Sequence, residues 1–174
     1  RSSDPVRMQR GLKPYGFAVV EELERLGIAV DVSHLSDGGF RDVLRVCKKP
    51  VVASHSNARA VWDHPRNLTD DMIRAVADSG GVIGLNFGGE FLGPGRGNRA
   101  EYIVRHAQHI LRVGGENVLA LGSDFDGISG KNEIASPDGC TTLLRAFQAQ
   151  NIPDRIIEKI WWENAGRVLR TLLG

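Results

Sequence analysis

Two histidines, His34 and His55, have a spacing that suits metal binding. Each one ends or closely follows a short apolar run rich in β-branched residues, IAVDVSH over 28–34 and PVVASHS over 50–56. Neighbouring parallel strands lie about 4.8 Å apart, so imidazoles at two such strand ends can reach one ion at about 2.0–2.1 Å. The alternative for either histidine alone is a buried ring that hydrogen-bonds to backbone. We predict that His34 and His55 are metal ligands.

A carboxylate, Asp124, ends a further apolar run, NVLALGSDF over 117–125. From the end of the fourth expected strand it can reach the same ion as the histidines from across the mouth of the fold. It can then act as general base toward a metal-activated water and later as general acid. Asp126 precedes Gly127, and loop hydrogen bonding explains it better. We predict that Asp124 is the catalytic residue.

The loop NARAVWDHPRNLTDD over 57–71 contains a candidate substrate-binding residue, Arg66. Its guanidinium can form a bidentate pair with a carboxylate of the substrate. The alternative is a surface arginine or a salt bridge that pins the loop. His64, in the same loop, has the pattern of a structural residue. His106 and His109 are three residues apart in a helical stretch, and the flanking arginines favour solvent exposure for both.

The elements that must position these residues alternate along the chain. Helical spacing of apolar residues favours helices over 15–27, 37–48, about 70–79, 99–113, 139–150 and 153–173. Ser36 and Thr69 can cap two of the helices, and Gly27 and Gly80 can end two. Strands are expected over 28–34, 50–56, 81–87 and 117–125. The glycine-rich stretch GPGRGN over 93–98 is expected to be a mobile loop.

This alternation is typical of an α/β fold with a parallel sheet and right-handed crossovers. The strands are apolar until their last residues, where the polar groups gather, as they do at the functional end of such folds. Four such units can form a small open sheet or half of a (β/α)8 barrel. Because a complete barrel typically needs about 250 residues, the 174 residues here suffice for half of one.

Composition excludes some classes of function. With 22 basic and 21 acidic residues, the net charge of +1 gives no electrostatic surface for nucleic acid. No apolar run approaches the roughly 18 residues that a membrane segment needs. The first sixteen residues lack an apolar leader, so we expect a cytoplasmic protein with Cys47 and Cys140 as free thiols. Residues 1–174 are predicted to form a single partial domain, with 1–10 irregular.

Several of these runs together resemble one family. DVSHLSD, KPVVASHSNARAVWDHPRNLTDDMI, GGVIGLNF and LGSDFDG closely resemble the membrane (renal) dipeptidase family of amidohydrolase-type barrels. GLKPYGFAVVEELERLG resembles the helix before that family's fifth strand. WWENAGRVL resembles its C-terminal helix, with Glu163 where the family has glycine. The resemblance covers nearly the whole chain from about residue 11.

The resemblance implies that the chain is the C-terminal half, strands 5–8, of a (β/α)8 TIM-type barrel with outer helices. It implies a zinc metallopeptidase that hydrolyses dipeptides, including those with a C-terminal D-residue, by a metal-activated hydroxide. By this resemblance His34 and His55 ligate one of two zinc ions. Arg66 binds the C-terminal carboxylate of the substrate, and Asp124 contacts substrate and handles protons.

The chain also departs from the family pattern. The family takes a His-x-Asp pair from its first strand and a bridging glutamate from a strand that is also earlier than those of this chain. None of the five histidines here has Asp two residues on, and Glu21, Glu22 and Glu24 lie in a predicted helix. The chain should therefore ligate at most one zinc well and be inactive alone. It should associate with the missing N-terminal half or form a homo-oligomer.

Two other functions stay open. A half-barrel could self-associate as a non-catalytic metal- or peptide-binding module, since an open sheet leaves edges to cover. Alternatively, another metallohydrolase reaction, that of an amidohydrolase or a phosphoesterase, could use the same residues. In that case Arg66 would bind phosphate.

Overall fold

The computed structural model describes residues 3–95 and 97–174 and contains a parallel sheet in the order β1-β2-β3. Its strands are β1 Val52–Ala53, β2 Val82–Leu85 and β3 Leu119–Leu121. The α-helices are α1 Pro5–Met8, α2 Pro14–Arg25, α3 Asp37–Val46, α4 Asp70–Asp78, α5 Ala100–Gly114, α6 Cys140–Ala149, α7 Asp154–Glu158 and α8 Asn164–Leu173. Short 3-10 turns are η1 Gly89–Phe91 and η2 Pro137–Gly139, and a π-helical turn, η3 Lys159–Glu163, joins α7 to α8. The fold is therefore mixed α/β with a parallel sheet.

Predicted helix ends agree with the structure where local capping decides them. The Ser36 hydroxyl accepts the Gly39 N–H at 3.0 Å, and the Thr69 hydroxyl accepts the Met72 N–H at 3.3 Å. Gly27 and Gly80 have φ of 71° and 73°, a left-handed conformation that glycine adopts without steric cost. The segment predicted to be irregular, 1–10, contains the single helical turn α1, which Asp4 caps.

The strand predicted over 28–34 is much shorter than expected. It is reduced to one parallel bridge between Asp31 and Val52. Two backbone bonds hold this bridge: the Val32 N–H donates to the Val52 carbonyl at 2.8 Å, and the Val52 N–H donates to the Val30 carbonyl at 3.1 Å. The other three apolar runs do form strands, each shorter than predicted.

The side chain of Asp31 is the physical reason for this early end. Its Oδ1 accepts the N–H of Ser33 at 3.0 Å and the N–H of Ser54 at 3.1 Å. The carboxylate thus takes the N–H of Ser54, a donor that would otherwise continue the ladder. The backbone opens at this point, just before His34 and His55.

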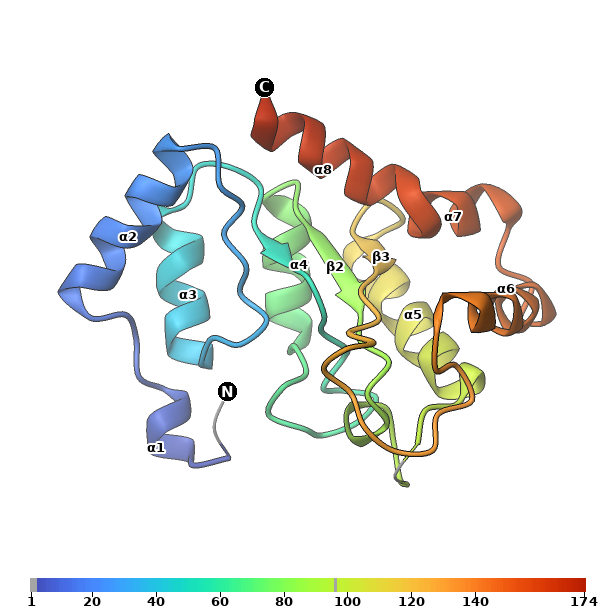
Figure 1. The fold of residues 1–174 in the computed structure, drawn as a ribbon. Coiled ribbons are helices and arrows are strands. Elements are labelled where there is room, and N and C mark those ends of the chain that lie inside the picture. The colour runs from blue at the N-terminus through green and yellow to red at the C-terminus, as the bar shows by residue number, and fades with distance from the viewer. Residues whose placement is uncertain (1–2, 96) are drawn as a thin grey trace.

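The helices and loops divide the molecule into a supporting end and an open end. Figure 1 shows α7 and α8 running across the end where β2 and β3 begin, with α4 and α5 beside the sheet and α6 beyond α5. The loops that follow the strands gather at the opposite end. This end carries His34, His55 and Asp124. In the described part of the chain no helix has the length and apolar character that a bilayer crossing requires.

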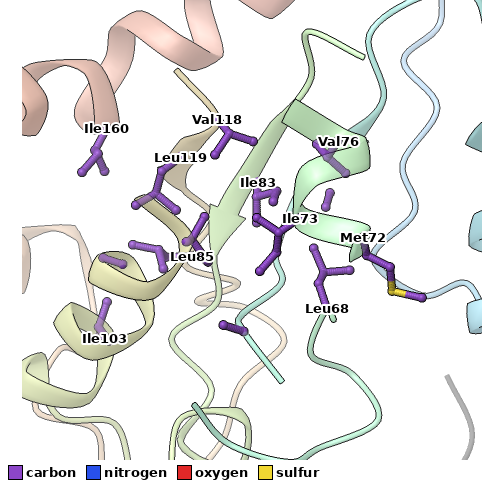
Figure 2. Packing of buried hydrophobic residues seen from close by; sticks show 14 of the residues in the cluster. Leu68, Met72, Ile73, Val76, Ile83, Leu85, Ile103, Val118, Leu119 and Ile160 are labelled. Atoms are coloured by element: carbon purple, nitrogen blue, oxygen red, sulfur yellow. The ribbon is translucent and has the colours of Figure 1, made fainter. Parts of the chain in front are cut away.

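The core lies between the sheet and these helices (Figure 2). Ile73 and Val76 of α4 pack toward Ile83 and Leu85 of β2, and all four are fully buried. The backbones approach closely at Gly122, directly after β3, where a Cβ atom would lie 1.9 Å from the Ser54 carbonyl oxygen. Glycine is required there because a larger residue would push the strand ends apart.

The C-terminal helical segment is attached to the sheet by two side chains. Asn164 donates to the carbonyls of Glu116 at 2.9 Å and Leu119 at 2.8 Å. Arg167 donates to the Gly80 carbonyl at 2.6 Å and the Asn117 carbonyl at 2.8 Å. The motif at the end of the chain is thus structural, since it satisfies backbone carbonyls at the start of the strands.

The prediction of an exposed His106 is wrong. Its side chain is fully buried, its Nδ1 accepts the Ala58 N–H at 3.1 Å, and its Nε2 donates to the Leu92 carbonyl at 3.0 Å. His109 is largely covered as well, with Nε2 2.7 Å from Asp70 Oδ1. The flanking arginines suggested exposure, but His106 faces the loop after β1 and holds it by both ring nitrogens.

His106 makes the stability of the fold depend on pH. Burial lowers its pKa from 6.5 to about 4. The unfolded chain therefore binds a proton that the folded chain excludes, so this contribution is present above pH 6.5 and is lost as pH falls toward 4. His106 should lower the free energy of unfolding by up to about 3 kcal/mol between pH 7 and 4. We expect His106→Gln, whose side chain does not titrate, to abolish this decrease. Urea unfolding at both pH values measures the free energy of unfolding, with His109→Gln as control. Parallel pH curves for wild type and His106→Gln would contradict the prediction.

Candidate functional site

His34 and His55 come together at the open end of the sheet. Their Nε2 atoms lie 2.8 Å apart, and their ring centroids are 4.9 Å apart with the rings tilted. Burial, then the positive charge of Arg66 and the proximity of His55, lower the pKa of His34. A neutral imidazole is the form that ligates a metal, so the surroundings favour ligation by His34.

The two rings fit a shared metal ion closely. Two nitrogens that each lie about 2.0–2.1 Å from one tetrahedral ion are separated by about 3.3 Å. The observed separation of 2.8 Å needs to widen by only a few tenths of an ångström. Among the described residues no cluster of three or more His, Cys, Asp or Glu side chains is assembled for a metal. Within this chain the candidate ligands are thus the two histidines.

The backbone and side chains around His55 hold it firmly. Its N–H donates to the Ser33 hydroxyl at 3.0 Å, and its Nδ1 lies 2.7 Å from the Ser54 hydroxyl. The Ser54 hydroxyl in turn donates to Asp31. Burial raises the pKa of Asp31, but the hydrogen bonds from Ser54 and Ser33 outweigh it and the net shift is downward. Asp31 is therefore an ionised acceptor behind the histidine.

Arg66 lies beside the histidine pair. Its Nη2 is 3.4 Å from His34 Nε2, another of its nitrogens donates to the Ser33 carbonyl, and its guanidinium carbon is 5.5 Å from the centre of the Phe91 ring. Burial lowers the pKa of Arg66, while the carboxylates of Asp124 and two other residues oppose that shift. The Arg66 guanidinium thus lies next to the histidine pair, with carboxylates near enough for their charges to act on it.

A second arginine in the same loop, Arg59, has the loop-pinning role that sequence left open for Arg66. It pairs with Asp37 through two bonds of 2.8 and 2.9 Å and also donates to the Asn67 and Pro65 carbonyls. These bonds attach the loop to the first turn of α3. Arg59 was not singled out from sequence, since nothing local relates it to Asp37, 22 residues away.

Asp124 lies at the same open end, in an unusual backbone conformation. Its φ is 60°, and the chain turns there, so β3 ends before it. Its Oδ2 accepts the Asn86 side-chain amide at 3.2 Å. A Cβ atom at Gly127 would lie 2.3 Å from Asp124 Oδ1, so glycine leaves room for the carboxylate. Asp124 contacts Asn86 directly and acts on Arg66 through its charge.

Buried amides connect these strand ends. Asn57 and Asn86 exchange two bonds, Asn57 Nδ2 to the Asn86 carbonyl at 3.0 Å and Asn86 N–H to Asn57 Oδ1 at 3.1 Å. The Gly88 N–H donates to Asn86 Oδ1 at 2.6 Å. The oxygen of the Asn86 amide is thereby assigned, and its NH₂ faces Asp124. The polar residues at the strand ends indicated Asn86 in the sequence, but they did not indicate that Asn57 is its partner.

The remaining residues singled out from sequence lie at the edge of the site. His64 packs on Phe91, with ring centroids 5.0 Å apart, and its Nδ1 accepts the Arg66 N–H at 3.2 Å. This agrees with a structural role for His64.

The glycine-rich loop over 93–98 is described except for Arg96, which lies outside the described residues. Buried Asn98 accepts the Ile134 N–H at 2.8 Å, which anchors the end of that loop. Cys47 and Cys140 are free thiols, as predicted.

Several known proteins are similar to this chain over almost its whole length. An uncharacterised protein of Klebsiella pneumoniae is 39% identical over 166 residues, covering 93% of this chain and 61% of the relative. An uncharacterised dipeptidase of Schizosaccharomyces pombe is 40% identical over 169 residues, covering 91% of this chain and 41% of the relative. A crystal structure of a metallopeptidase from Rhodobacter sphaeroides, bound to a phosphinate mimic of the dipeptide L-Ala-D-Ala, is similar with a TM-score of 0.88 and 38% identity.

That comparison covers 94% of this chain and 48% of the solved one, so the chain spans about half the length of the solved protein. Family membership is nevertheless clear, because the match extends over almost all of the chain. The profile of the family described as membrane dipeptidase (peptidase family M19) matches residues 1–172. The chain belongs to the membrane dipeptidase family, peptidase family M19.

Proposed function

We propose that this chain is the C-terminal half, strands 5–8, of a (β/α)8 barrel, and that the complete protein is a zinc-dependent dipeptidase. The observation that carries the proposal is the convergence of His34 and His55 at 2.8 Å beside Arg66. Parallel strands in sequential order, with helices between them, support the barrel. So does the match to about half of a solved metallopeptidase.

The proposed metal ligands are His34 and His55. A bound zinc would supply Lewis-acid chemistry, activating water and polarising the scissile carbonyl. Two imidazoles are fewer protein ligands than the three usual in catalytic zinc sites. The N-terminal half must therefore supply the remaining ligands, including those of the second zinc. Association of the two halves completes the site in this proposal.

The edges of the sheet support such an association. The bridge at Asp31 ends one side of the sheet, and no described strand pairs with the outer side of β3. Leu26 and Ile28, which precede the bridge, are about half exposed. Unpaired strand edges and exposed apolar residues favour burial against further chain. The first four strands of the barrel would cover them.

Arg66 would bind the C-terminal carboxylate of the dipeptide. Its planar group can donate two parallel bonds to a carboxylate, and it is next to His34. That distance suits a short substrate whose carboxylate lies one residue from the scissile bond. The bound ligand of the Rhodobacter sphaeroides metallopeptidase mimics L-Ala-D-Ala. We therefore include dipeptides with a C-terminal D-residue among the proposed substrates.

Asp124 would take a proton from the attacking water and deliver it to the leaving amine. The Asn86 amide holds one carboxylate oxygen of Asp124 in place, which supports this role. Arg66 is near enough for its charge and that of Asp124 to interact. Both groups then contact substrate, one at the carboxylate and one at the reacting bond.

The first test of this proposal is metal content together with activity of the complete protein. We expect hydrolysis of L-Ala-D-Ala to be lost on chelation and restored by zinc. His34→Ala and His55→Ala should each lower the zinc content measured by elemental analysis. His109→Ala, a histidine that contacts Asp70 instead, is the control. A protein that binds zinc but hydrolyses no dipeptide would show that the proposed substrate is wrong.

Arg66→Lys tests carboxylate recognition. Lysine keeps the charge but loses the bidentate fork, so we expect KM for a free dipeptide to rise about tenfold or more, since a bond to a charged group contributes about 1.5–3 kcal/mol. A dipeptide with a C-terminal amide should be poor for wild type and little changed by the substitution. If wild type accepts the amide as well as the free acid, Arg66 has another partner. Preference for a phosphate ester would then favour the phosphoesterase alternative.

Asp124→Asn tests the proton-handling role. The amide keeps the size of the side chain but cannot accept a proton, so we expect kcat to fall about 10²- to 10⁴-fold. Zinc content should stay unchanged, since Asp124 is not a proposed ligand. Asp126→Asn, at the exposed position two residues on, is the matched control. Equal losses in both variants would point to a loop effect and against catalysis by Asp124.

A further inference from the structure

We infer that Ser54 and Asp31 set the tautomer of His55 and thereby aim its Nε2 lone pair at the metal position. These two are positioning residues: they act through the histidine and touch neither substrate nor metal. The inference rests on the proposed metal site and adds a requirement that the ligand set alone does not contain. Three hydrogen bonds carry it.

The first step is the direction of the bond between Ser54 and Asp31. An ionised carboxylate only accepts hydrogen bonds, and a serine hydroxyl has one hydrogen to donate. Asp31 already accepts the backbone N–H groups of Ser33 and Ser54 through Oδ1. Its Oδ2 is in close contact with the Ser54 hydroxyl, so the single hydroxyl hydrogen of Ser54 is donated to Asp31.

The second step is the state of the His55 ring. Ser54 Oγ lies 2.7 Å from His55 Nδ1. With its hydrogen committed to Asp31, the oxygen can only accept, so Nδ1 must carry a proton. In a neutral imidazole one nitrogen donates and the other accepts. Nε2 of His55 is then unprotonated and carries the lone pair that a metal requires.

The third step is the direction of that lone pair. His55 Nε2 faces His34 Nε2 at 2.8 Å, so its lone pair points into the space between the two rings, where the proposed metal ion would bind. Arg66 Nη2, which can only donate, lies 3.4 Å from His34 Nε2. His55 is prepared in advance because its backbone N–H also donates to Ser33 at 3.0 Å.

A purely structural role for the same residues predicts a different outcome. If the Asp31 carboxylate serves only to end the strand ladder, loss of the Ser54 hydroxyl costs stability and leaves the His55 tautomer unchanged. The ring state and the metal affinity are therefore the discriminating measurements. Ser56 gives a matched control. It is a buried serine on the same strand end, and its hydroxyl has no hydrogen-bond partner among the described residues.

The experiment uses the complete protein with Ser54→Ala, Ser54→Thr and Ser56→Ala. Zinc affinity is measured by competition with a chromophoric chelator. The tautomer of His55 is read from ¹⁵N chemical shifts of histidine-labelled, metal-free protein, and urea unfolding reports stability. We expect Ser54→Ala to weaken zinc binding about 10- to 100-fold, as loss of a hydrogen bond behind a ligand does. Its His55 should gain the Nε2–H tautomer. Ser54→Thr keeps a hydroxyl, so it should retain the zinc affinity and the His55 tautomer of wild type. Ser56→Ala should match wild type in both.

Two results would overturn the inference: His55 protonated at Nε2 in metal-free wild type, or equal zinc affinity in Ser54→Ala and wild type. Dipeptide hydrolysis is assayed on the same samples, which separates this inference from the proposed function. Hydrolysis by wild type with no effect of Ser54→Ala on zinc or tautomer refutes only the positioning role. A Ser54 effect on zinc in a protein that hydrolyses no dipeptide supports the positioning role and refutes the proposed substrate.

Discussion

The pairing of Asp31 with Val52 sets the register on which the open end of the sheet depends. The two residues are 21 positions apart, and so are His34 and His55. A slip of one residue would turn one of the imidazoles to the other side of the sheet. Buried valines on both segments, Val32 beside β1 and Val51 before it, oppose such a slip. The hydrophobic core thereby determines that the two rings meet.

Local signals in the sequence predicted the parts of this arrangement that depend on neighbours along the chain. Ser36 caps a helix because its hydroxyl reaches an N–H three residues on, and Gly80 ends a helix because it adopts a positive φ. The length of the strand predicted over 28–34 depended on a side-chain contact with another segment. Its β-branched residues favour an extended ladder, but the carboxylate of Asp31 accepts the N–H of Ser54, the next donor on the β1 side, and ends it. Residue type alone does not reveal that competition.

Partners distant in sequence explain the other differences. His106 lies in a helix whose flanking residues suit a solvated face, yet its ring satisfies Ala58 and Leu92, 48 and 14 residues away. Arg59 and Arg66 occupy one loop and have the same chemistry, and sequence could not assign their roles. The structure separates them by their neighbours, because Arg59 is held by Asp37 while Arg66 faces His34. The site roles of His34, His55, Arg66 and Asp124 stay predictions.

The amides of Asn57 and Asn86 add a mechanical link between the two sides of the site. Asn57 follows His55 by two residues and exchanges hydrogen bonds with Asn86, which in turn holds Asp124, so the segment after the proposed metal ligand is connected to the proposed proton carrier. Both amides are buried, and a buried amide that loses a partner costs about 1–3 kcal/mol. The left-handed conformation of Asp124, which costs about 1–2 kcal/mol, is thus retained because leaving it would break the bond to Asn86. Buried hydrogen bonds therefore tie together the strand ends that carry the imidazole and the carboxylate.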